Sequence, residues 1–305
     1  MKYDCTVVVV TYNSDSNKLY STLLSIIKQK SISIQIVISD DGSLNFEKES
    51  LEKWFEKNSV LDYKIVTSEI NTGTVKNVIR GVKAADAEIV KLISPGDLLY
   101  DEYVLYKMVS FMKKENLKLA FGKGAYYSQE DNNIRLYDFC NPKDLEPYKA
   151  KNKLKIQKNY LLYRDYVLGA LFLTNKILYL NYLAKIDGLV KYAEDCSVIM
   201  MIADGIEIGF LDEFLIWYEY GSGISTNGSK VWEERIRNDN NNCFKLLYNA
   251  GGAYKDVFAW HLGNRNLKTF WYKLQCKLHN KKVSMRKTNY IQEMDIEKLR
   301  KQLEV

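Results

Sequence analysis

Five short groups of polar residues, spread between Thr11 and Asp195, have the composition of a ligand-binding site. They are Thr11-Tyr12-Asn13, Asp40-Asp41-Gly42-Ser43, Asn71-Thr72-Gly73 with Asn77, Ser94-Pro95-Gly96-Asp97, and Glu194-Asp195. Carboxylates in such groups accept hydrogen bonds, hold divalent cations or take up a proton. A tyrosine ring beside them offers a flat surface on which a base can stack. The combination points to a nucleotide-type ligand.

The first four groups follow elements that place them together. Val7–Val10 is a run of β-branched residues typical of a fully buried strand, and Ile34–Ile38 and Glu88–Ile93 are predicted strands of the same kind. Helices with one apolar stripe are predicted between the strands: one capped by Asp15 or Ser16, one over Phe46–Lys57 and one over Thr74–Ala85. This alternation predicts an α/β fold with a mostly parallel, Rossmann-like central sheet. Ligands bind beyond the carboxyl ends of the strands in such a sheet.

Beyond Asp97 the alternation of strands and helices becomes irregular. We expect a mobile loop over Asn141–Lys158, because this segment contains two of the three prolines and many lysines. The remainder from Lys230 to Val305 is predicted to be mostly helical. Further helices are predicted over Tyr103–Lys114 and from Glu194-Asp195 to about Ala203, short strands over Leu117–Phe121, Gly124–Tyr127, Ile134–Tyr137, Ile206–Phe210 and Phe214–Tyr218, and a tight, flexible loop over Gly221–Ser225.

The composition excludes several classes of protein. No stretch approaches 18 consecutive apolar residues, so no transmembrane helix is expected, and the N-terminus lacks the apolar run of a signal peptide. A cytoplasmic location follows. The 5 cysteines are scattered, odd in number and without CxxC spacing, which favours reduced thiols over a disulfide framework or a zinc site.

The net charge of +6 is concentrated near the C-terminus. Residues 257–292 contain no Asp or Glu but have eight Lys or Arg residues. Within this segment Leu267, Phe270, Trp271, Leu274 and Leu278 recur at helical spacing among lysines. Two explanations stay open: peripheral attachment to an anionic membrane at the inner face of the cell, or a helix packed on the protein with a solvated basic side. Nucleic-acid binding is disfavoured, because no recognised nucleic-acid motif accompanies the charge.

In order and approximate spacing, the five polar groups and the strand before Asn13 resemble the family 2 glycosyltransferases, which are inverting enzymes with the GT-A fold. The resemblance covers about the first 225 residues. It implies a catalytic domain over 1–225, with a nucleotide-binding half (1–100) and an acceptor-binding half (101–225), followed by a helical extension (226–305). It also implies a nucleoside-diphosphate sugar as donor.

A pyrimidine base needs a flat wall and an acceptor for its N3–H. Tyr12 is predicted to stack on the base and Asp40 to accept the hydrogen bond; alternatively Tyr12 packs on the next helix. Asp41 either contacts the ribose or caps a turn. Asn71 and Gly73 either let the backbone approach the nucleotide or form a plain turn. Further residues assigned to the nucleotide-sugar site are Thr11, Asn13, Lys76, Asn77, Ser94 and Gly96, and for Lys76 a solvated helix face is the alternative.

Ser94-Pro95-Gly96-Asp97 departs from the family pattern. Members of the family usually carry Asp-x-Asp here, and the last carboxylate holds a divalent ion that bridges the donor diphosphate. Asp97 is the one acid left in this group. Since a hard cation can bind through one carboxylate plus phosphate oxygens and water, we expect Asp97 to hold Mg²⁺ or Mn²⁺. The alternative is that Asp97 caps a helix starting near Tyr100.

Glu194-Asp195 matches the acidic pair that family members carry at the start of the helix beneath the acceptor site. The match makes Asp195 the base that takes the acceptor proton and Glu194 an auxiliary or acceptor-contacting residue. The alternative is that both acids are simply favoured by the helix dipole.

The sequence therefore predicts single-sugar transfer from a UDP- or dTDP-linked donor to a hydroxyl of a glycan or lipid-linked oligosaccharide. The family suggests capsule, exopolysaccharide or lipopolysaccharide synthesis. The alternative is a non-catalytic sugar-nucleotide-binding or scaffold protein with a degenerate metal motif. A nucleotidyltransferase is disfavoured because no basic, glycine-rich loop follows the first strand, and an NAD-binding fold because no GxGxxG does. The sugar, linkage and oligomeric state stay open.

Overall fold

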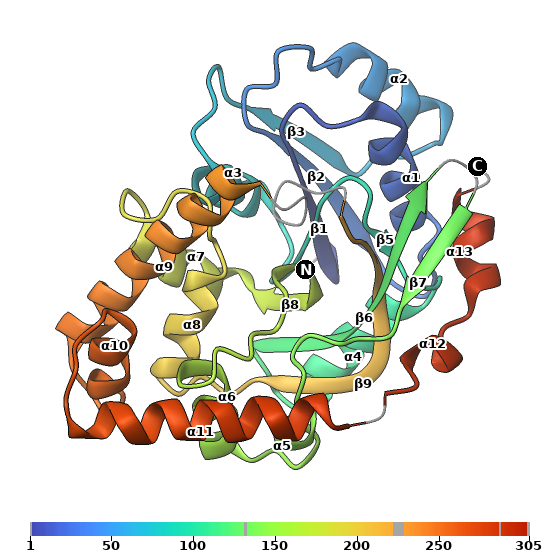
Figure 1. The fold of residues 1–305 in the computed structure, drawn as a ribbon. Helices are drawn as coiled ribbons and strands as arrows, with labels where there is room; N and C mark the ends of the chain where they lie inside the picture. The colour runs from blue at the N-terminus through green and yellow to red at the C-terminus, as the bar shows by residue number, and fades with distance from the viewer. Residues whose placement is uncertain (1, 131–132, 222–228, 287, 304–305) are drawn as a thin grey trace.

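The valine-rich strand β1 (Cys5–Thr11) lies at the centre of the N-terminal sheet in the computed structural model (Figure 1). It pairs in parallel with β2 (Ile34–Asp40) and β4 (Ile89–Ile93), and β3 (Tyr63–Thr67) extends the sheet in parallel beyond β2. The valines in the middle of β1 are fully buried, which requires helices on both faces of the sheet. The structure describes residues 2–130, 133–221, 229–286 and 288–303.

Three helices connect these strands at the places that the sequence predicts: α1 (Ser16–Ile27), α2 (Lys48–Lys57) and α3 (Thr74–Ala84). The Asp15 side chain caps α1 by accepting from the backbone N–H of Lys18 at 3.0 Å. Helix α3 packs closely on the sheet because Gly81 leaves room: a Cβ there would lie 2.5 Å from Cγ1 of Val8. This close packing brings the start of α3 to the carboxyl edge of the strands.

The second half of the sheet is mixed. Strand β8 (Phe172–Asn175) runs antiparallel between β4 and β6 (Leu119–Glu130), and β9 (Gly209–Glu219) pairs in parallel with β6. Two further strands pair antiparallel with this half: β5 (Leu98–Leu99) with β9, and β7 (Asn133–Tyr137) with β6. The strand order of the whole sheet is β3-β2-β1-β4-β8-β6-β9-β5, with β7 beside β6. The predicted α/β fold with a mostly parallel central sheet and flanking helices is confirmed.

Four short strands of the prediction are in fact two long ones. β6 contains Gly124–Tyr127 and, from Leu119 on, the strand predicted over Leu117–Phe121. β9 contains all of Phe214–Tyr218 but only Gly209 and Phe210 of the strand predicted over Ile206–Phe210. The gap between the two predicted strands falls at Gly122 and Lys123. In the structure it is an irregularity in the β6–β9 register, where the Lys123 ammonium pairs with Asp212 at 3.2 Å and Glu293 at 2.8 Å.

The prediction of a mobile loop over Asn141–Lys158 is wrong. This segment forms α5 (Glu146–Lys149) and most of α6 (Lys153–Leu161). Pro147 stands in the first turn of α5, where proline is tolerated because its missing N–H has no intrahelical partner there. Tyr148 and Ile156 bury their side chains in the core. Pro147 thus marks a helix start, and the lysines mark a solvated face.

The C-terminal region is helical, as predicted, and its helices return to the core. Phe244, Phe258 and Leu299 belong to the same buried cluster as the sheet. In Figure 1, α9 lies beside α8 and α10 packs on α9, and α11 runs below β9 and α6. The helices of this half are α4 (Val104–Lys114), α7 (Lys176–Ile186), α8 (Cys196–Ala203), α9 (Lys230–Ala250), α10 (Lys255–His261), α11 (Leu267–Ser284), α12 (Tyr290–Glu293) and α13 (Ile296–Leu303).

The predicted domain boundary after residue 225 and most of the predicted loop Gly221–Ser225 lie outside the described residues. Within the described part of the chain, no helix combines the length and the apolarity needed to cross a membrane.

Lys91, in the middle of β4, is a fully buried cation. Its ammonium donates to the carbonyl oxygen of Leu92 at 2.6 Å and to that of Ala170 in the 3₁₀ turn η1 (Gly169–Leu171). The bond to Ala170 ties this turn to the central sheet. Burial lowers the pKa of Lys91 to about 8. The attraction to the Asp97 carboxylate acts in the opposite direction and raises this pKa, but its effect is smaller.

This depressed pKa makes the stability contribution of Lys91 depend on pH. Between about pH 8 and pH 10.5 the unfolded chain keeps a proton on Lys91 that the folded chain has lost, so wild-type stability should rise with pH relative to Lys91→Met. The rise should be on the order of 3 kcal/mol at most, since one pKa unit corresponds to about 1.4 kcal/mol. Urea denaturation of both proteins across this range measures it. A difference that does not change with pH would show that Lys91 titrates normally.

Candidate functional site

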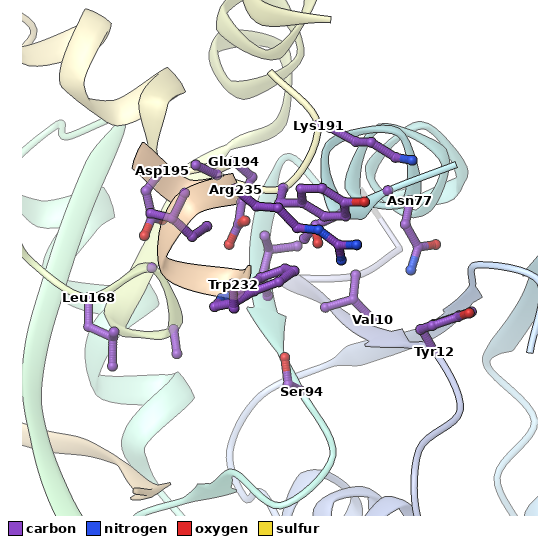
Figure 2. A pocket seen from close by; sticks show the side chains of 18 of the residues that line it. Val10, Tyr12, Asn77, Ser94, Leu168, Lys191, Glu194, Asp195, Trp232 and Arg235 are labelled. Carbon is purple, nitrogen blue, oxygen red and sulfur yellow. The ribbon is translucent and has the colours of Figure 1, made fainter. Parts of the chain in front are cut away.

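A large cavity, about 1530 Å³ in volume, opens at the carboxyl edge of the parallel strands (Figure 2). Its wall combines the ends of β1 and β4, the start of α3, the turn η1, the segment before α8 and the first turns of α9. The predicted residues on the wall are Thr11, Tyr12, Asn13, Asp41, Asn71, Gly73, Asn77, Ser94, Asp97, Glu194 and Asp195. All five polar groups of the sequence therefore meet at one cavity.

Three predicted residues do not line this cavity. Asp40 is buried beneath the wall, and its carboxylate accepts from the Thr11 hydroxyl at 2.8 Å and from the Ser43 N–H and hydroxyl at 2.8 and 2.6 Å. Lys76 points to solvent on α3. Gly96 is buried in the Ser94–Asp97 turn with φ +100°, and a Cβ there would lie 2.4 Å from Oε2 of Glu219. Asp40 and Gly96 thus shape the wall from behind it.

Tyr12 and Asn77 lie where the prediction places a nucleotide. The Tyr12 ring is 39% exposed and faces the cavity, so the alternative of a ring packed on the next helix is not what the structure has (Figure 2). Asn77 is buried and donates from Nδ2 to the Thr11 carbonyl at 3.2 Å, while its Oδ1 accepts from the Ser39 hydroxyl at 2.7 Å. Asn77 therefore fixes the ends of β1 and β2 relative to α3.

Asp41 organises the turn that precedes α3. Its carboxylate accepts from the N–H groups of Thr72 at 3.1 Å and Gly73 at 2.7 Å and pairs loosely with Arg80. Gly73 has φ +95°, and a Cβ there would lie 2.4 Å from the Lys191 side chain. A glycine is required because the segment before α8 crosses the turn at this point.

Asp97 sits at the floor of the cavity, after β4. It is 5% exposed, and its Oδ1 accepts from the backbone N–H of Glu219 at 3.3 Å. Burial raises the pKa of Asp97 to about 7. The alternative role as a helix cap does not apply, because β5 follows directly and α4 begins only at Val104.

The carboxylates at this end of the cavity determine whether a metal ion fits. Glu219 neighbours Asp97, but its carboxylate is already paired with the Lys18 ammonium at 2.7 Å. Among the described residues, no three His, Cys, Asp or Glu side chains are grouped closely enough to hold an ion. The residues therefore fit an ion that takes one bond from Asp97 and its other ligands from a bound molecule and water.

Glu194 and Asp195 lie on the opposite side of the cavity, before α8 (Figure 2). Asp195 occupies the N-cap position of α8, where the helix dipole favours an acid, and makes no side-chain capping bond. Its carboxylate accepts instead from the backbone N–H of Gly169. A Cβ on Gly169 would lie 2.2 Å from Oδ1 of Asp195. Loss of hydration raises the pKa of both acids, and their mutual repulsion adds to the rise for Glu194.

The sequence analysis missed the residues that α9 contributes. Trp232 and Arg235 project into the cavity, and Lys191 reaches it from the segment before α8 (Figure 2). The Tyr192 ring links them: its centroid lies 4.9 Å from that of Trp232 and 5.3 Å from the Arg235 guanidinium. Trp232 and Arg235 are spaced i, i+3 on a predicted helix, which places them on one face, but nothing in the sequence shows that this face meets the cavity.

Asp239 holds α9 against the segment that carries the acids. Its carboxylate is buried and accepts from three consecutive backbone N–H groups, those of Lys191 at 3.2 Å, Tyr192 at 2.6 Å and Ala193 at 3.1 Å. One turn of α9 is thereby fixed to the residues directly before Glu194. The positions of Arg235 and of the two acids are therefore coupled.

Comparison with solved structures identifies the fold. The S. aureus TarS fragment 1-349 superposes with a TM-score of 0.56 at 19% identity, over 93% of this chain and 77% of that one. The same fragment in complex with UDP-GlcNAc gives 0.56 at 17% identity, over 90% and 73%. The mannosyltransferase PcManGT from Pyrobaculum calidifontis, in complex with GDP-Man and Mn²⁺, gives 0.58 at 14% identity, over 91% and 81%. These likenesses confirm the predicted GT-A architecture.

No curated protein matches the sequence. The family model for glycosyl transferase family 2, however, matches residues 6–172, more than half of the chain, and this range contains four of the five polar groups. With the motifs, the cavity and the fold in agreement, the chain belongs to glycosyl transferase family 2.

Proposed function

We propose that this protein transfers a single sugar, with inversion at the anomeric carbon, from a nucleoside-diphosphate sugar to a hydroxyl of a glycan or lipid-linked oligosaccharide. One observation carries the proposal: a cavity lined by Tyr12, Asn77 and Asp97 on one side has the acid Asp195 on the other. The donor carries UDP or dTDP, and the pathway is surface-polysaccharide synthesis in the capsule, exopolysaccharide or lipopolysaccharide class.

In this proposal the base stacks on Tyr12, and the ribose lies near Asn13, Asp41 and Asn71. The N3–H of the base is not assigned to the Asp40 carboxylate, because three protein donors already occupy it and it does not line the cavity. Asp40 acts by holding Thr11 and Ser43 in place, and Ser43 in turn accepts from the backbone N–H of Asn13 at 2.7 Å. The base-binding edge is thus positioned through Asp40.

The diphosphate lies between the Ser94–Asp97 turn and the cations of the opposite wall. A divalent ion touching Asp97, Mg²⁺ or Mn²⁺, would neutralise charge on the leaving diphosphate when bound. Lys191 and Arg235 supply cationic donors from the protein itself, and a guanidinium suits phosphate oxygens because it presents several N–H groups in one plane. In this proposal Lys191 and Arg235 are the cationic residues of the nucleotide-sugar site, in place of Lys76, which the sequence analysis assigned to that site and which is exposed to solvent.

The chemical step is a single displacement. The acceptor hydroxyl oxygen attacks the anomeric carbon as its proton passes to the Asp195 carboxylate. The new carbon–oxygen bond forms while the bond to the diphosphate oxygen breaks, and the electron pair leaves with the nucleoside diphosphate. Asp195 is held for this role by the Gly169 N–H, and its raised pKa makes it a stronger base than an ordinary aspartate. Glu194 supports it from the adjacent position.

The competing function is a sugar-nucleotide-binding scaffold without chemistry. It predicts the same donor site but no use for Asp195. The observation against it is the acid pair: two half-buried carboxylates with raised pKa values lower the stability of the fold, and acids of this kind cluster at functional sites. Slow hydrolysis of bound donor separates the two functions without knowledge of the acceptor.

A second proposal concerns the location of the protein. On α11 the side chains of Phe270, Trp271 and Leu278 are 67%, 60% and 58% exposed. At about 100° per residue they lie within one quarter to one third of the helix surface, opposite the buried His279 and Val283. Exposed lysines flank them: Lys268, Lys273, Lys277, Lys281 and Lys282. We infer peripheral attachment of this face to an anionic membrane.

The catalytic assignment predicts that two substitutions reduce transfer while leaving donor binding intact. Asp195→Asn should lower transfer and donor hydrolysis by about 10²–10⁴-fold, the usual contribution of a general base. Gly169→Ala should lower them by about 10²-fold, because a Cβ displaces the Asp195 carboxylate. The rate should rise with pH well above the ordinary Asp range of about 4, since only the ionised form accepts the proton. Kinetics with calorimetry of nucleotide binding test this.

The matched control is Asp187→Asn, an exposed acid at the end of α7 that should change nothing. Full activity in Asp195→Asn would move the base to Glu194. Binding of donor without any hydrolysis by wild type would favour the scaffold.

The diphosphate assignment predicts that Asp97→Asn and Arg235→Gln fail differently. Asp97→Asn should remove the Mn²⁺-dependent part of donor affinity. This part should be stronger at pH 8 than at pH 6 in wild type, because the Asp97 pKa is about 7. Arg235→Gln should weaken binding about tenfold or more with or without Mn²⁺, as loss of a charge-assisted hydrogen bond does. Donor titrations at both pH values, with Lys53→Gln as the exposed control, distinguish the cases. Metal-independent binding and turnover in wild type would refute the role of Asp97.

The membrane assignment predicts that Lys273, Lys277, Lys281 and Lys282 changed together to Gln reduce sedimentation with phosphatidylglycerol vesicles. Each charge contributes about 1 kcal/mol near such a surface. The same charge change at Lys53, Lys57, Lys83 and Lys114, which are exposed elsewhere, should have little effect. Wild-type protein that sediments with neither anionic nor neutral vesicles would leave α11 as a packed helix with a solvated basic side.

A further inference from the structure

A second, smaller cavity adjoins the first at Asp195. It has a volume of about 410 Å³, within the range of about 300–1,000 Å³ typical of small-molecule sites. Arg164, Tyr166, Leu168 and Asp195 line both cavities. The proposed base therefore stands between the donor cavity and a second space with its own wall.

The helix α11 supplies one side of this second wall, through His279 and Asn280. The His279 ring is 8% exposed and stacks on Tyr163, with centroids 4.2 Å apart and planes 20° from parallel. Its Nε2 has no hydrogen-bond partner among the described residues, and the nearest carboxylate oxygen, Oδ2 of Asp165, is 3.6 Å away, beyond hydrogen-bond range. A polar atom left unpaired in so buried a ring is unusual and indicates a missing partner.

The rest of the lining combines rings with amides. Tyr163 and Tyr166 provide aromatic surface, and Asn141 and Asn280 provide side chains that both donate and accept hydrogen bonds. Two cationic residues, Lys143 and Arg164, and two acids, Asp165 and Asp195, line the same space, so their formal charges balance and favour a neutral ligand. Neutral, many-hydroxylated molecules with an apolar face match such a lining: the face packs on a ring and the hydroxyls meet the amides.

We propose that this cavity binds the acceptor sugar ring that carries the attacking hydroxyl, and that α11 completes the acceptor site. The inference rests on the proposed function, because it takes Asp195 as the base. It extends that function by assigning the acceptor class, a neutral pyranose, to named residues. A sugar ring here has one edge at Asp195 and therefore faces the donor cavity.

The chain contains 2 histidines, and each reports on a different place. His279 lines the second cavity, and His261 lines only the first. In protein labelled with ¹³C-histidine, the two imidazole signals can be assigned with His279→Phe, which keeps a ring on Tyr163. Methyl glycosides of glucose, galactose, mannose and N-acetylglucosamine are then titrated up to their solubility limits. At least one should move the His279 signal and leave that of His261 in place.

Variants then test the wall itself. Asn280→Ala, at an exposed position, should weaken the affinity of the responding glycoside by about three- to tenfold, the effect of one lost hydrogen bond. Ser284→Ala, exposed one turn further along α11, is the matched control and should leave it unchanged. Neither variant should alter UDP binding. Since Asn280 contributes nothing to the core, its effect cannot be attributed to unfolding.

Failure of the inference and of the proposed function give different results. If no glycoside moves the His279 signal, or if the response is at His261, the second cavity is not the acceptor site, whatever the donor assays show. If the protein neither binds nor hydrolyses any nucleotide sugar, the proposed function fails even where a glycoside reaches His279. An unchanged glycoside affinity in Asn280→Ala would overturn the role given to α11.

Discussion

The bond between the buried Lys91 ammonium and the Ala170 carbonyl connects the two halves of the site. Lys91 belongs to β4, which ends at the Ser94–Asp97 turn, and Ala170 belongs to the turn whose Gly169 N–H holds Asp195. Asp97 and Asp195, on the two sides of the cavity, are therefore joined through a single buried cation. Lys91 also interacts favourably with Asp97, so the same charge acts on both sides. A neutral side chain at this position would remove the link while keeping the strand.

A second constraint holds α9, whose first turns line the cavity, in place. Asp239 fixes α9 to three consecutive backbone N–H groups directly before the acid pair. Charge-assisted bonds to backbone donors are among the stronger hydrogen bonds in proteins, and this carboxylate is buried. The helix that carries Arg235 is thus tied through Asp239 to the segment that leads into Glu194 and Asp195.

The sequence predicts the nucleotide half of the fold well because each of its elements is short, periodic and closed by a recognisable turn. Asp15 caps α1 as expected, and the helix after Gly73 buries the expected valines. The second half is less predictable, because its long strands carry a polar irregularity at Lys123 that depends on partners far along the chain, Asp212 and Glu293. The loop predicted over Asn141–Lys158 fails for a related reason: tertiary burial of Tyr148 and Ile156 outweighs the local composition.

The residues of the candidate site likewise fall into a predictable and an unpredictable group. Eleven of the predicted residues line the cavity, since strand ends of a parallel sheet must converge. The local sequence pattern could not show that the Asp40 carboxylate points inward to Thr11 and Ser43. Nor could it show that Gly169 packs directly against the Asp195 carboxylate. It also gives no sign that Arg235 and His279, on distant helices, line the two cavities. Those contacts are set by packing between elements far apart in sequence.

Helix α11 has two faces with unrelated tasks in these proposals. One face carries His279 and Asn280 toward the second cavity, and the other presents Phe270 and Trp271 outward. The helix lies wholly after residue 172, where the match to the family model ends. Selection for a new acceptor can therefore act on this helix without disturbing the residues that read the nucleotide. The residues proposed to contact the base and the ribose lie before residue 172, and those that α11 adds to the proposed acceptor wall lie after it, so these two groups can diverge at different rates.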